Sequence, residues 1–248
     1  MATPSNKDIH ANIAANLEHI EARIVAACAR VGRARSEVTL VAVSKTRPAT
    51  EIIAAYRCGV RHFGENRVEE MEEKTPPLRA EFTADPAIWH LIGHVQSRKA
   101  KRAAELADIV HSVDSLHLAE RMNRCAAERG VRLPVLLECN VSGEEAKYGF
   151  AAWDDSAWAE AWAQIQQLER LDHLEVRGLM TMAPIVAQPE EARPVFRRLR
   201  HLRDILRQAA PFSAWAELSM GMTDDFEVAI EEGATLVRIG RAIFGPRT

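Results

Sequence analysis

Eight short apolar runs alternate with helix-forming segments along the sequence, and this alternation constrains the fold more than any other feature. Several runs are apolar along their whole length, which is typical of parallel strands that are covered on both faces. Strict alternation of strands and helices predicts an α/β protein with a parallel sheet, and eight strands are the number that closes a (β/α)8 TIM-type barrel. An open doubly wound sheet stays an alternative, because periodicity alone does not establish closure. The expected strands cover residues 38–45, 61–66, 88–95, 108–114, 133–140, 176–183, 216–222 and 235–242.

A single domain accounts for the whole chain. Its 248 residues fit one barrel, which typically needs about 250 residues, and no linker or shift in composition divides the sequence. Residues 5–31 carry apolar side chains at helical spacing, with Ser5 as a cap and Gly32 at the end. We therefore expect one domain over residues 1–248, in which residues 1–32 form a helix that precedes the first strand.

Composition excludes several classes of function. With 32 basic and 35 acidic residues, the formal net charge of −3 does not favour nucleic acid as a partner. Four scattered cysteines show neither metal-ligand spacing nor a disulfide framework, which predicts no metal site and a reducing compartment. The first ten residues lack the apolar core of a signal peptide. No apolar run approaches the roughly 18 residues of a membrane span. We expect a cytoplasmic protein without a membrane partner.

Lys45 is the first candidate for chemistry. Only six of the 32 basic residues are lysines, and Lys45 ends the apolar run 38–45. Chemistry in TIM barrels lies at the carboxyl ends of the strands. There a partly desolvated lysine has a lowered pKa, and its amine can attack an aldehyde. The alternative is a lysine whose amine extends from a strand end into solvent.

The last two strands are candidates for an anion site. Ser219 lies in the segment LSMGM, and Gly240 and Arg241 follow the eighth strand in VRIGRAIFG. Barrels often bind phosphate with the loops after strands seven and eight. The Ser219 hydroxyl and the backbone N–H groups of Gly240 and Arg241 are suitable donors. The alternative is that the glycines are ordinary turn residues.

Arg238 and Asn66 are two further candidates. Arg238 lies within an apolar strand, where an unpartnered guanidinium is very costly, so it must face a carboxylate, the barrel mouth or a ligand. An internal ion pair with Glu227 or Glu217 is the structural alternative. Asn66 ends the second strand and can hydrogen-bond a ligand ring oxygen, whereas we expect Glu69 and Glu70 only to complement the dipole of the following helix.

Other charged residues are expected to be solvated. Lys147 lies in a polar loop, which predicts a solvated or gating residue. The basic clusters at Arg98–Lys101 and along residues 193–207 are expected to form solvated faces. No aromatic platform for RNA bases accompanies them.

Eight motifs together resemble the pyridoxal 5′-phosphate (PLP) homeostasis protein family, also called the proline synthetase co-transcribed proteins. The likeness extends from Ala42 to Gly245. The motifs are AVSKTRP (42–48), FGENRVEE (63–70), WHLIGHVQSRK (89–99), VDS (113–115), NVSGEEAKYGF (140–150), VRGLMTMAP (176–184), LSMGMTDDFEVAIEEGAT (218–235) and VRIGRAIFG (237–245).

The resemblance implies a fold-type III PLP barrel like the N-terminal domain of alanine racemase, and it implies a role for each candidate residue. Lys45 matches the lysine that holds PLP as a Schiff base, and Asn66 matches a residue near the cofactor ring. Ser219, Gly240 and position 241 match the phosphate cradle, where Arg241 contributes either its charge or only its backbone amide. Arg238 matches the arginine that faces the pyridine nitrogen.

The function implied is intracellular PLP homeostasis without strong catalysis. An arginine at the pyridine nitrogen disfavours the protonated ring that serves as an electron sink. The sequence also ends soon after the eighth strand, so we expect it to lack the racemase β-domain with its catalytic tyrosine. The alternative is a weak amino-acid racemase with Tyr148 or Cys139 as the second base. A phosphate-sugar barrel without PLP is a third, disfavoured reading. Apo forms of PLP-dependent enzymes are the expected recipients, and a monomer is the simpler expectation.

Overall fold

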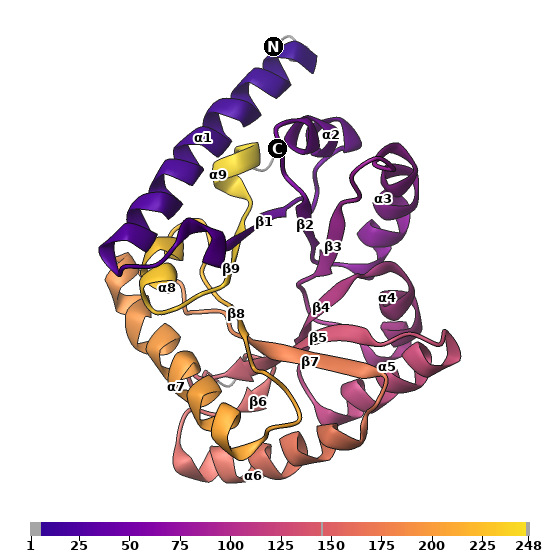
Figure 1. Ribbon diagram of the computed structural model, residues 1–248, viewed down its shortest axis with the longest axis vertical. Coiled ribbons are helices and arrows are strands. Elements are labelled where there is room, and N and C mark those ends of the chain that lie inside the picture. Colours follow the sequence, from indigo (N-terminus) through magenta and orange to yellow (C-terminus); the bar gives the residue numbers. More distant parts are fainter. Residues whose placement is uncertain (1–5, 145, 247–248) are drawn as a thin grey trace.

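Eight parallel strands form a closed barrel in the computed structural model, which describes residues 6–144 and 146–246 (Figure 1). Each strand pairs with the next along the chain, and β1 pairs with the last strand, β9. The prediction of a TIM-type barrel is therefore confirmed, and the open-sheet alternative is wrong. The barrel strands are β1 (Thr39–Val43), β2 (His62–Glu65), β3 (Ile88–Leu91), β4 (Ile109–Val113), β5 (Leu133–Asn140), β7 (Leu174–Met180), β8 (Glu217–Ser219) and β9 (Leu236–Ile239).

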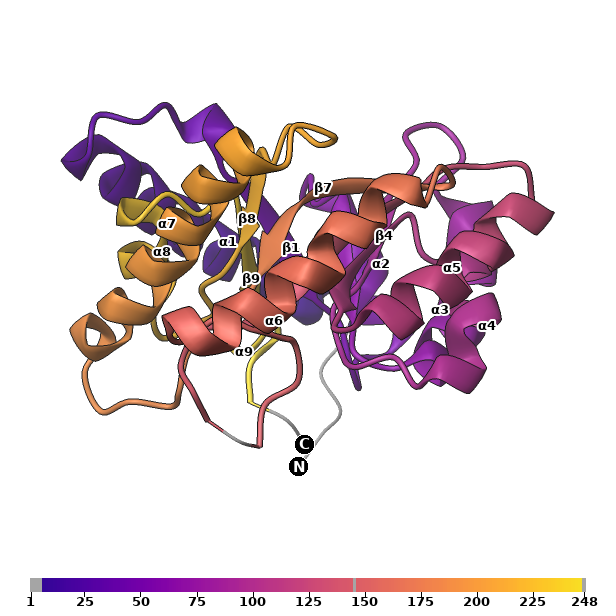
Figure 2. The same ribbon diagram turned by 90° about the horizontal axis from the view of Figure 1, so that it is seen from below.

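Helices form an outer ring around the barrel (Figures 1 and 2). Most of them connect one strand to the next, which is the arrangement that keeps neighbouring strands parallel. They are α1 (Asn6–Arg30), α2 (Ala49–Arg57), α3 (Val68–Glu81), α4 (Ala100–Leu106), α5 (Leu116–Glu128), α6 (Asp155–Ile165), α7 (Arg193–Ala209), α8 (Phe226–Glu231) and α9 (Arg241–Phe244). Within the described residues, no helix is both long and apolar enough to cross a bilayer.

The N-terminal helix α1 covers the place where the two ends of the barrel meet. It packs against α2, which follows the first strand, and against α8 and α9, which flank the last strand. Arg23 of α1 donates two hydrogen bonds of 2.8 Å to the carboxylate of Glu227 on α8. The helix thus connects segments from both ends of the chain.

Two apolar layers lie on opposite sides of the barrel wall. The larger layer fills the space between strands and helices, and it includes the buried rings of Phe63, Trp89 and Trp215. A small separate cluster fills the barrel itself, and its members are Val41, Leu136, Met180 and Leu236. Side chains two residues apart on a strand share a face. Glu138 and Arg238 therefore face the interior as well, above the cluster.

The strands are shorter than the sequence indicates, and the difference lies mainly at their carboxyl ends. β8 ends at Ser219, after which Gly221 takes a φ of 91°. β9 ends at Ile239, and the chain then forms α9. Between these two strands, α8 begins at Phe226, after a turn in which the Asp225 carboxylate accepts the Met222 N–H over 2.6 Å. A short extra strand that the sequence did not predict, β6 (Phe150–Ala151), pairs with β5.

Candidate functional site

Four adjacent strands carry all six candidate residues at their carboxyl ends. The order around the barrel is β8, β9, β1, β2, so segments far apart in sequence become neighbours. Ser219 ends β8, Arg238 lies on β9 with Gly240 and Arg241 directly after it, Lys45 follows β1, and Asn66 follows β2. One wall of the barrel mouth therefore contains all six candidate binding residues.

Lys45 lies in a tight turn that directly follows β1. The N–H of Arg47 donates to the Ser44 carbonyl over 3.0 Å, and Thr46 takes a φ of 64°. A β-branched residue in this region of φ is strained, and such strain persists only where the surroundings impose it. The side chain of Lys45 is half-buried.

Three charged side chains hold this turn in place. The Lys74 amine of α3 donates to the Ser44 carbonyl over 2.9 Å and to Glu65 over 3.1 Å. Glu70 accepts the Thr46 N–H over 2.6 Å and a bond from Lys74 over 3.0 Å. The expectation that Glu70 only complements the helix dipole is therefore wrong, because its carboxylate fixes the backbone next to Lys45.

Glu65 lies at the centre of this cluster and is completely buried. Burial raises its pKa to about 7, although the Lys74 charge and the Ser44 hydroxyl, which donates over 2.7 Å, act in the opposite direction. The carboxyl therefore changes charge near neutral pH, directly beneath the Lys45 turn.

Arg238 and Ser219 form a buried pair inside the barrel. One Arg238 nitrogen donates to the Ser219 hydroxyl over 2.5 Å, and the other donates to the Thr181 carbonyl over 2.9 Å. Burial lowers the pKa of Arg238 to about 10, while the carboxylates of Asp225 and Glu138 act to raise it. The guanidinium thus stays charged at neutral pH.

The suggested ion pairs of Arg238 are not found, because both carboxylates have other partners. Glu227 receives two hydrogen bonds from Arg23, and Glu217 lies 3.9 Å from Arg177. The side chain of Arg238 therefore contacts polar groups of the barrel interior.

Two glycines let the backbone of the candidate phosphate loops approach its neighbours. A Cβ on Gly240 would lie 3.2 Å from the Val43 carbonyl oxygen, and a Cβ on Gly221 would lie 2.5 Å from the Cβ of Ala229. Both glycines are therefore more than ordinary turn residues. The Arg241 side chain is exposed and pairs with Asp224, so only its backbone amide remains suited to the cradle.

The backbone of Asn66 lies close to the segment that follows β3. A Cβ on Gly93 would lie 2.2 Å from the Asn66 carbonyl oxygen, so only glycine fits there. Beyond it, Nδ1 of His94 lies 2.9 Å from the Asp114 carboxylate, and the His94 ring stacks on Tyr148 with ring centroids 3.9 Å apart. These side chains border the mouth on the side of β3 and β4.

Two predictions of solvated charge need correction. The Lys147 amine contacts the Ser142 hydroxyl at 3.2 Å, the Met182 carbonyl at 3.1 Å and the Glu144 carboxylate, so it fastens its loop to the end of β7. On α7, three arginines gather on the buried carboxylate of Glu232 at distances of 3.0 to 3.3 Å. They are Arg193, Arg197 and Arg200.

Glu138 is a site residue that the sequence reasoning missed. It is 4% exposed and faces the barrel interior, and its Oε2 has no hydrogen-bond partner among the described residues. Burial raises its pKa to about 7, helped by the charge of Asp114 and opposed by that of Arg238. An acidic residue in the apolar run LPVLLECN was the available signal.

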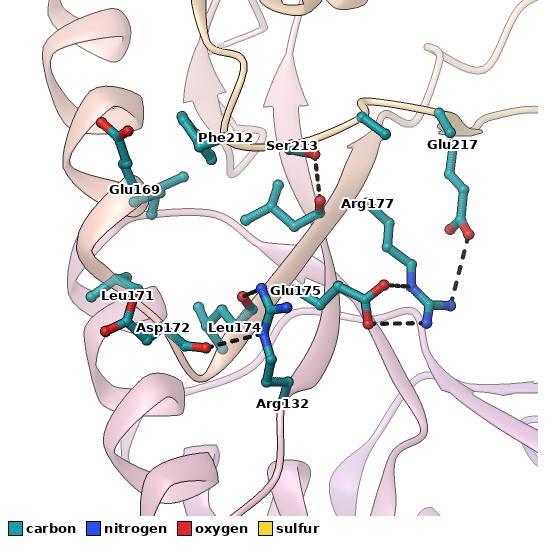
Figure 3. A pocket seen from close by; sticks show the side chains of 14 residues that line it. Arg132, Glu169, Leu171, Asp172, Leu174, Glu175, Arg177, Phe212, Ser213 and Glu217 are labelled. Atoms are coloured by element: carbon teal, nitrogen blue, oxygen red, sulfur yellow. Dashed lines mark hydrogen bonds and ion pairs between the residues drawn. The ribbon is translucent and has the colours of Figure 1, made fainter.

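A separate hollow lies at the opposite end of the barrel (Figure 3). It measures about 440 Å³ and is lined by the starts of β7 and β8. Its basic groups are already engaged: Arg132 donates to the carbonyls of Asp172 and Leu174, and Arg177 donates to Glu175 (Figure 3). The candidate residues at the mouth are distant from this hollow.

Comparison with known proteins agrees with the barrel and its motifs. A family model described as the N-terminal domain of alanine racemase matches residues 15–248. A pyridoxal phosphate homeostasis protein of Pseudomonas aeruginosa is 42% identical over 238 residues, which are 95% of this chain and 96% of that protein. The relative of the same name from Aquifex aeolicus is 39% identical over 236 residues, 95% of this chain and 99% of that protein.

Solved structures show the same likeness. PipY of Synechococcus elongatus, solved with PLP bound, superposes with a TM-score of 0.79 at 38% identity and covers 94% of this chain and 100% of its own. An alanine racemase of Clostridium difficile superposes with a TM-score of 0.69 at 16% identity, over 94% of this chain and 56% of its own, which shows a shared fold. The chain belongs to the family of pyridoxal phosphate homeostasis proteins.

Proposed function

We propose that this protein binds PLP at the carboxyl ends of β8, β9, β1 and β2 and serves intracellular PLP homeostasis. One observation carries the proposal. Four adjacent strands bring a half-buried lysine, a buried serine–arginine pair and a close-packed glycine to one wall of the barrel mouth. The names of the relatives and the PLP-bound structure of PipY support the same ligand.

The residues present fit the three chemical groups of PLP. The Lys45 amine suits the aldehyde of PLP, which reacts reversibly with primary amines. The Ser219 hydroxyl and the backbone N–H groups of Gly240 and Arg241 suit the phosphate. Arg238 suits the pyridine nitrogen, where it provides a hydrogen-bond donor.

A storage role is favoured over racemase activity by two features. Arg238 stays charged at neutral pH, and a donor of this kind disfavours protonation of the ring nitrogen. Cys139, one suggested second base, belongs to the apolar layer outside the barrel, and burial raises the pKa of its thiol. Tyr148, the other, is 56% exposed and stacks on His94.

The experiment that tests PLP binding is a visible spectrum of the purified protein before and after PLP is added, followed by borohydride reduction and peptide mapping. We expect a new visible band and a pyridoxyl mass on the peptide that contains Lys45. Lys45→Ala should lose both, and Lys101→Ala, a surface control, should retain both. Label on another lysine would refute the assignment.

A second experiment separates storage from racemase activity. PLP-loaded protein is incubated in deuterated water with single-enantiomer amino acids, and we expect no deuterium at Cα beyond that seen with free PLP. Exchange that is faster, and that disappears in Tyr148→Phe, would favour the racemase.

The remaining expectations belong to this proposal. We propose that residues 1–248 act as one domain and as a monomer in the cytoplasm, and that apo PLP-dependent enzymes receive the cofactor. The four free cysteines support a reducing compartment. Size-exclusion chromatography with light scattering tests the monomer directly.

A further inference from the structure

Three histidines form a continuous hydrogen-bonded chain through the barrel interior. Nδ1 of His62 lies 2.9 Å from Nε2 of His90, and Nδ1 of His90 lies 2.8 Å from Nε2 of His111. Nδ1 of His111 then lies 2.9 Å from the Ser219 hydroxyl. The rings come from the adjacent strands β2, β3 and β4, and the last bond crosses the barrel to β8. The histidine chain therefore ends at Ser219, a candidate residue for binding phosphate.

The other end of the chain reaches a cavity on the opposite side of the barrel. His62 is half-buried and helps to line a cavity of about 710 Å³ between α1 and the starts of β1 and β2. His90 and His111 are completely buried. The two ends of the barrel are thus connected by side chains that can each exchange protons.

Burial keeps the two inner rings neutral. It lowers the pKa of His90 to about 3, with the charges of His62 and Arg177 acting in the same direction. It lowers the pKa of His111 well below 6.5, with the charges of His90, Arg238 and His62 acting in the same direction. A neutral imidazole has one donor and one acceptor nitrogen. All hydrogen bonds of the histidine chain must therefore have the same donor-to-acceptor direction, so the histidine chain has two states.

The two states differ in what Ser219 can offer a ligand. Arg238 has no acceptor, so it always donates to the Ser219 oxygen. When every histidine carries its hydrogen on Nδ1, His111 also donates to Ser219, and the hydroxyl hydrogen is available to a ligand. When every histidine carries its hydrogen on Nε2, Ser219 must give its hydrogen to His111.

We propose that the chain His62–His90–His111 positions the hydroxyl hydrogen of Ser219, so that anion binding at the mouth and proton uptake at His62 favour one another. This inference rests on the proposed binding of PLP. A protonated His62 has hydrogens on both nitrogens, so its Nδ1 must donate to His90. That direction is the one in which Ser219 is a donor to phosphate. The three histidines are positioning residues and do not touch the cofactor.

His62 is the end of the histidine chain that changes charge, because the arginines beside it already have acidic partners. Arg35 pairs with Glu21 over 2.6 Å, and Arg61 pairs with Asp85 over 2.5 Å. From the interior, His90 is the titratable neighbour. Burial lowers the pKa of His62, so it starts out neutral at pH 7. The other titratable groups that line the cavity are His10, Glu18 and Cys58.

The direct test uses wild-type protein with ¹⁵N-labelled histidine and long-range ¹H–¹⁵N NMR, without and with one equivalent of PLP. We expect His90 and His111 to change from the Nε2–H to the Nδ1–H form when PLP binds, and the visible band of the same sample reports binding. A visible band with unchanged histidine forms would overturn this inference and leave the proposed function intact. A sample that binds no PLP refutes both.

The second test compares the pH dependence of PLP affinity between pH 6 and pH 8. His62→Gln cannot take up a proton, and His10→Gln is a matched control that lines the same cavity outside the chain. Protonation of PLP itself affects all three proteins equally and therefore cancels in the comparison. As the pH falls, we expect the PLP affinity of wild type and of His10→Gln to increase about fivefold relative to that of His62→Gln. Uptake of one proton allows at most a tenfold change per pH unit. Parallel profiles for all three proteins contradict the proposal.

Discussion

The backbone N–H of Thr46 donates a hydrogen bond to Oε2 of Glu70 over 2.6 Å, so helix α3 holds the turn that carries Lys45. Thr46 has a φ of 64° and is strained. The bond from Glu70 thus stabilises a backbone conformation that threonine on its own disfavours.

Removing this carboxylate should loosen the Lys45 turn. We expect Glu70→Ala to lower the free energy of unfolding by about 1 to 3 kcal/mol, because the carboxylate accepts hydrogen bonds from both Thr46 and Lys74. It should also weaken PLP binding by more than Glu69→Ala does. Glu69 lies on the same helix and pairs with Lys99 at the surface, so it is the control. Urea denaturation and PLP titration measure the two effects. Equal affinities for the two variants would show that the turn does not need Glu70.

Glu138 should make the protein less stable as the pH rises from about 4.5 to 7. Its folded pKa of about 7 lies above the ordinary value of 4.5, so the folded state prefers the proton. That preference stabilises the fold below pH 4.5 and is lost as the pH passes through 7. We expect Glu138→Gln to raise the free energy of unfolding at pH 8 by about 1 to 3 kcal/mol relative to its effect at pH 4. A difference that does not vary with pH contradicts the buried, titrating carboxyl.

Glu232 should show the opposite dependence on pH. Burial acts to raise its pKa, but the hydrogen bonds from Arg193 and Arg197 outweigh burial and lower it below 4.5. Its contribution to stability is present above pH 4.5 and is lost as the pH falls through the folded pKa. We expect Glu232→Gln to cost about 1 to 3 kcal/mol at pH 7 and much less at pH 3. Glu128→Gln, which breaks an exposed pair with Lys101, should change little at either pH.

Substitutions at Gly221 and Gly130 should distinguish the cost of a steric clash from the cost of backbone strain. Both have a positive φ, 91° and 65°, but a Cβ on Gly221 would lie 2.5 Å from the Cβ of Ala229, whereas nothing lies within 4 Å of a Cβ on Gly130. We expect Gly130→Ala to cost about 1 kcal/mol from strain and Gly221→Ala to cost about 2 to 5 kcal/mol because a clash adds to it. Thermal unfolding compares them, and equal costs would rule out the clash.

The sequence predicts the barrel well because its strands are short apolar runs bounded by clear breaks. All eight expected strands are present. Their ends were predicted too long because the residues after Ser219 and Ile239 stay apolar while the chain already turns, at Gly221 and at Gly240. Apolar character reports burial, and burial continues beyond the last ladder hydrogen bond.

The candidate site was predictable only in part. Lys45, Ser219 and Arg238 belong to local motifs, and the position of each at a strand end follows from the sequence. The bond from Lys74 to the Ser44 carbonyl joins residues 30 positions apart, and the bond from His111 to Ser219 joins residues 108 apart. Such contacts depend on strand register and on barrel closure, which no local pattern contains. The histidines in the runs IWHLIGHV (His90 and His94) and DIVHSVD (His111) were the available hint.

The pairing of β1 with β9 has a consequence for synthesis. Thr39 aligns with Leu236 in this pairing, so the turn of Lys45 meets the loops of Ser219 and Gly240 only after almost the whole chain has been translated. Contacts between such distant segments form late in folding. We therefore expect a ribosome-bound nascent chain that lacks its last strand to bind no PLP, because the proposed site is then incomplete. The proposed site therefore places PLP binding after translation of the last strand.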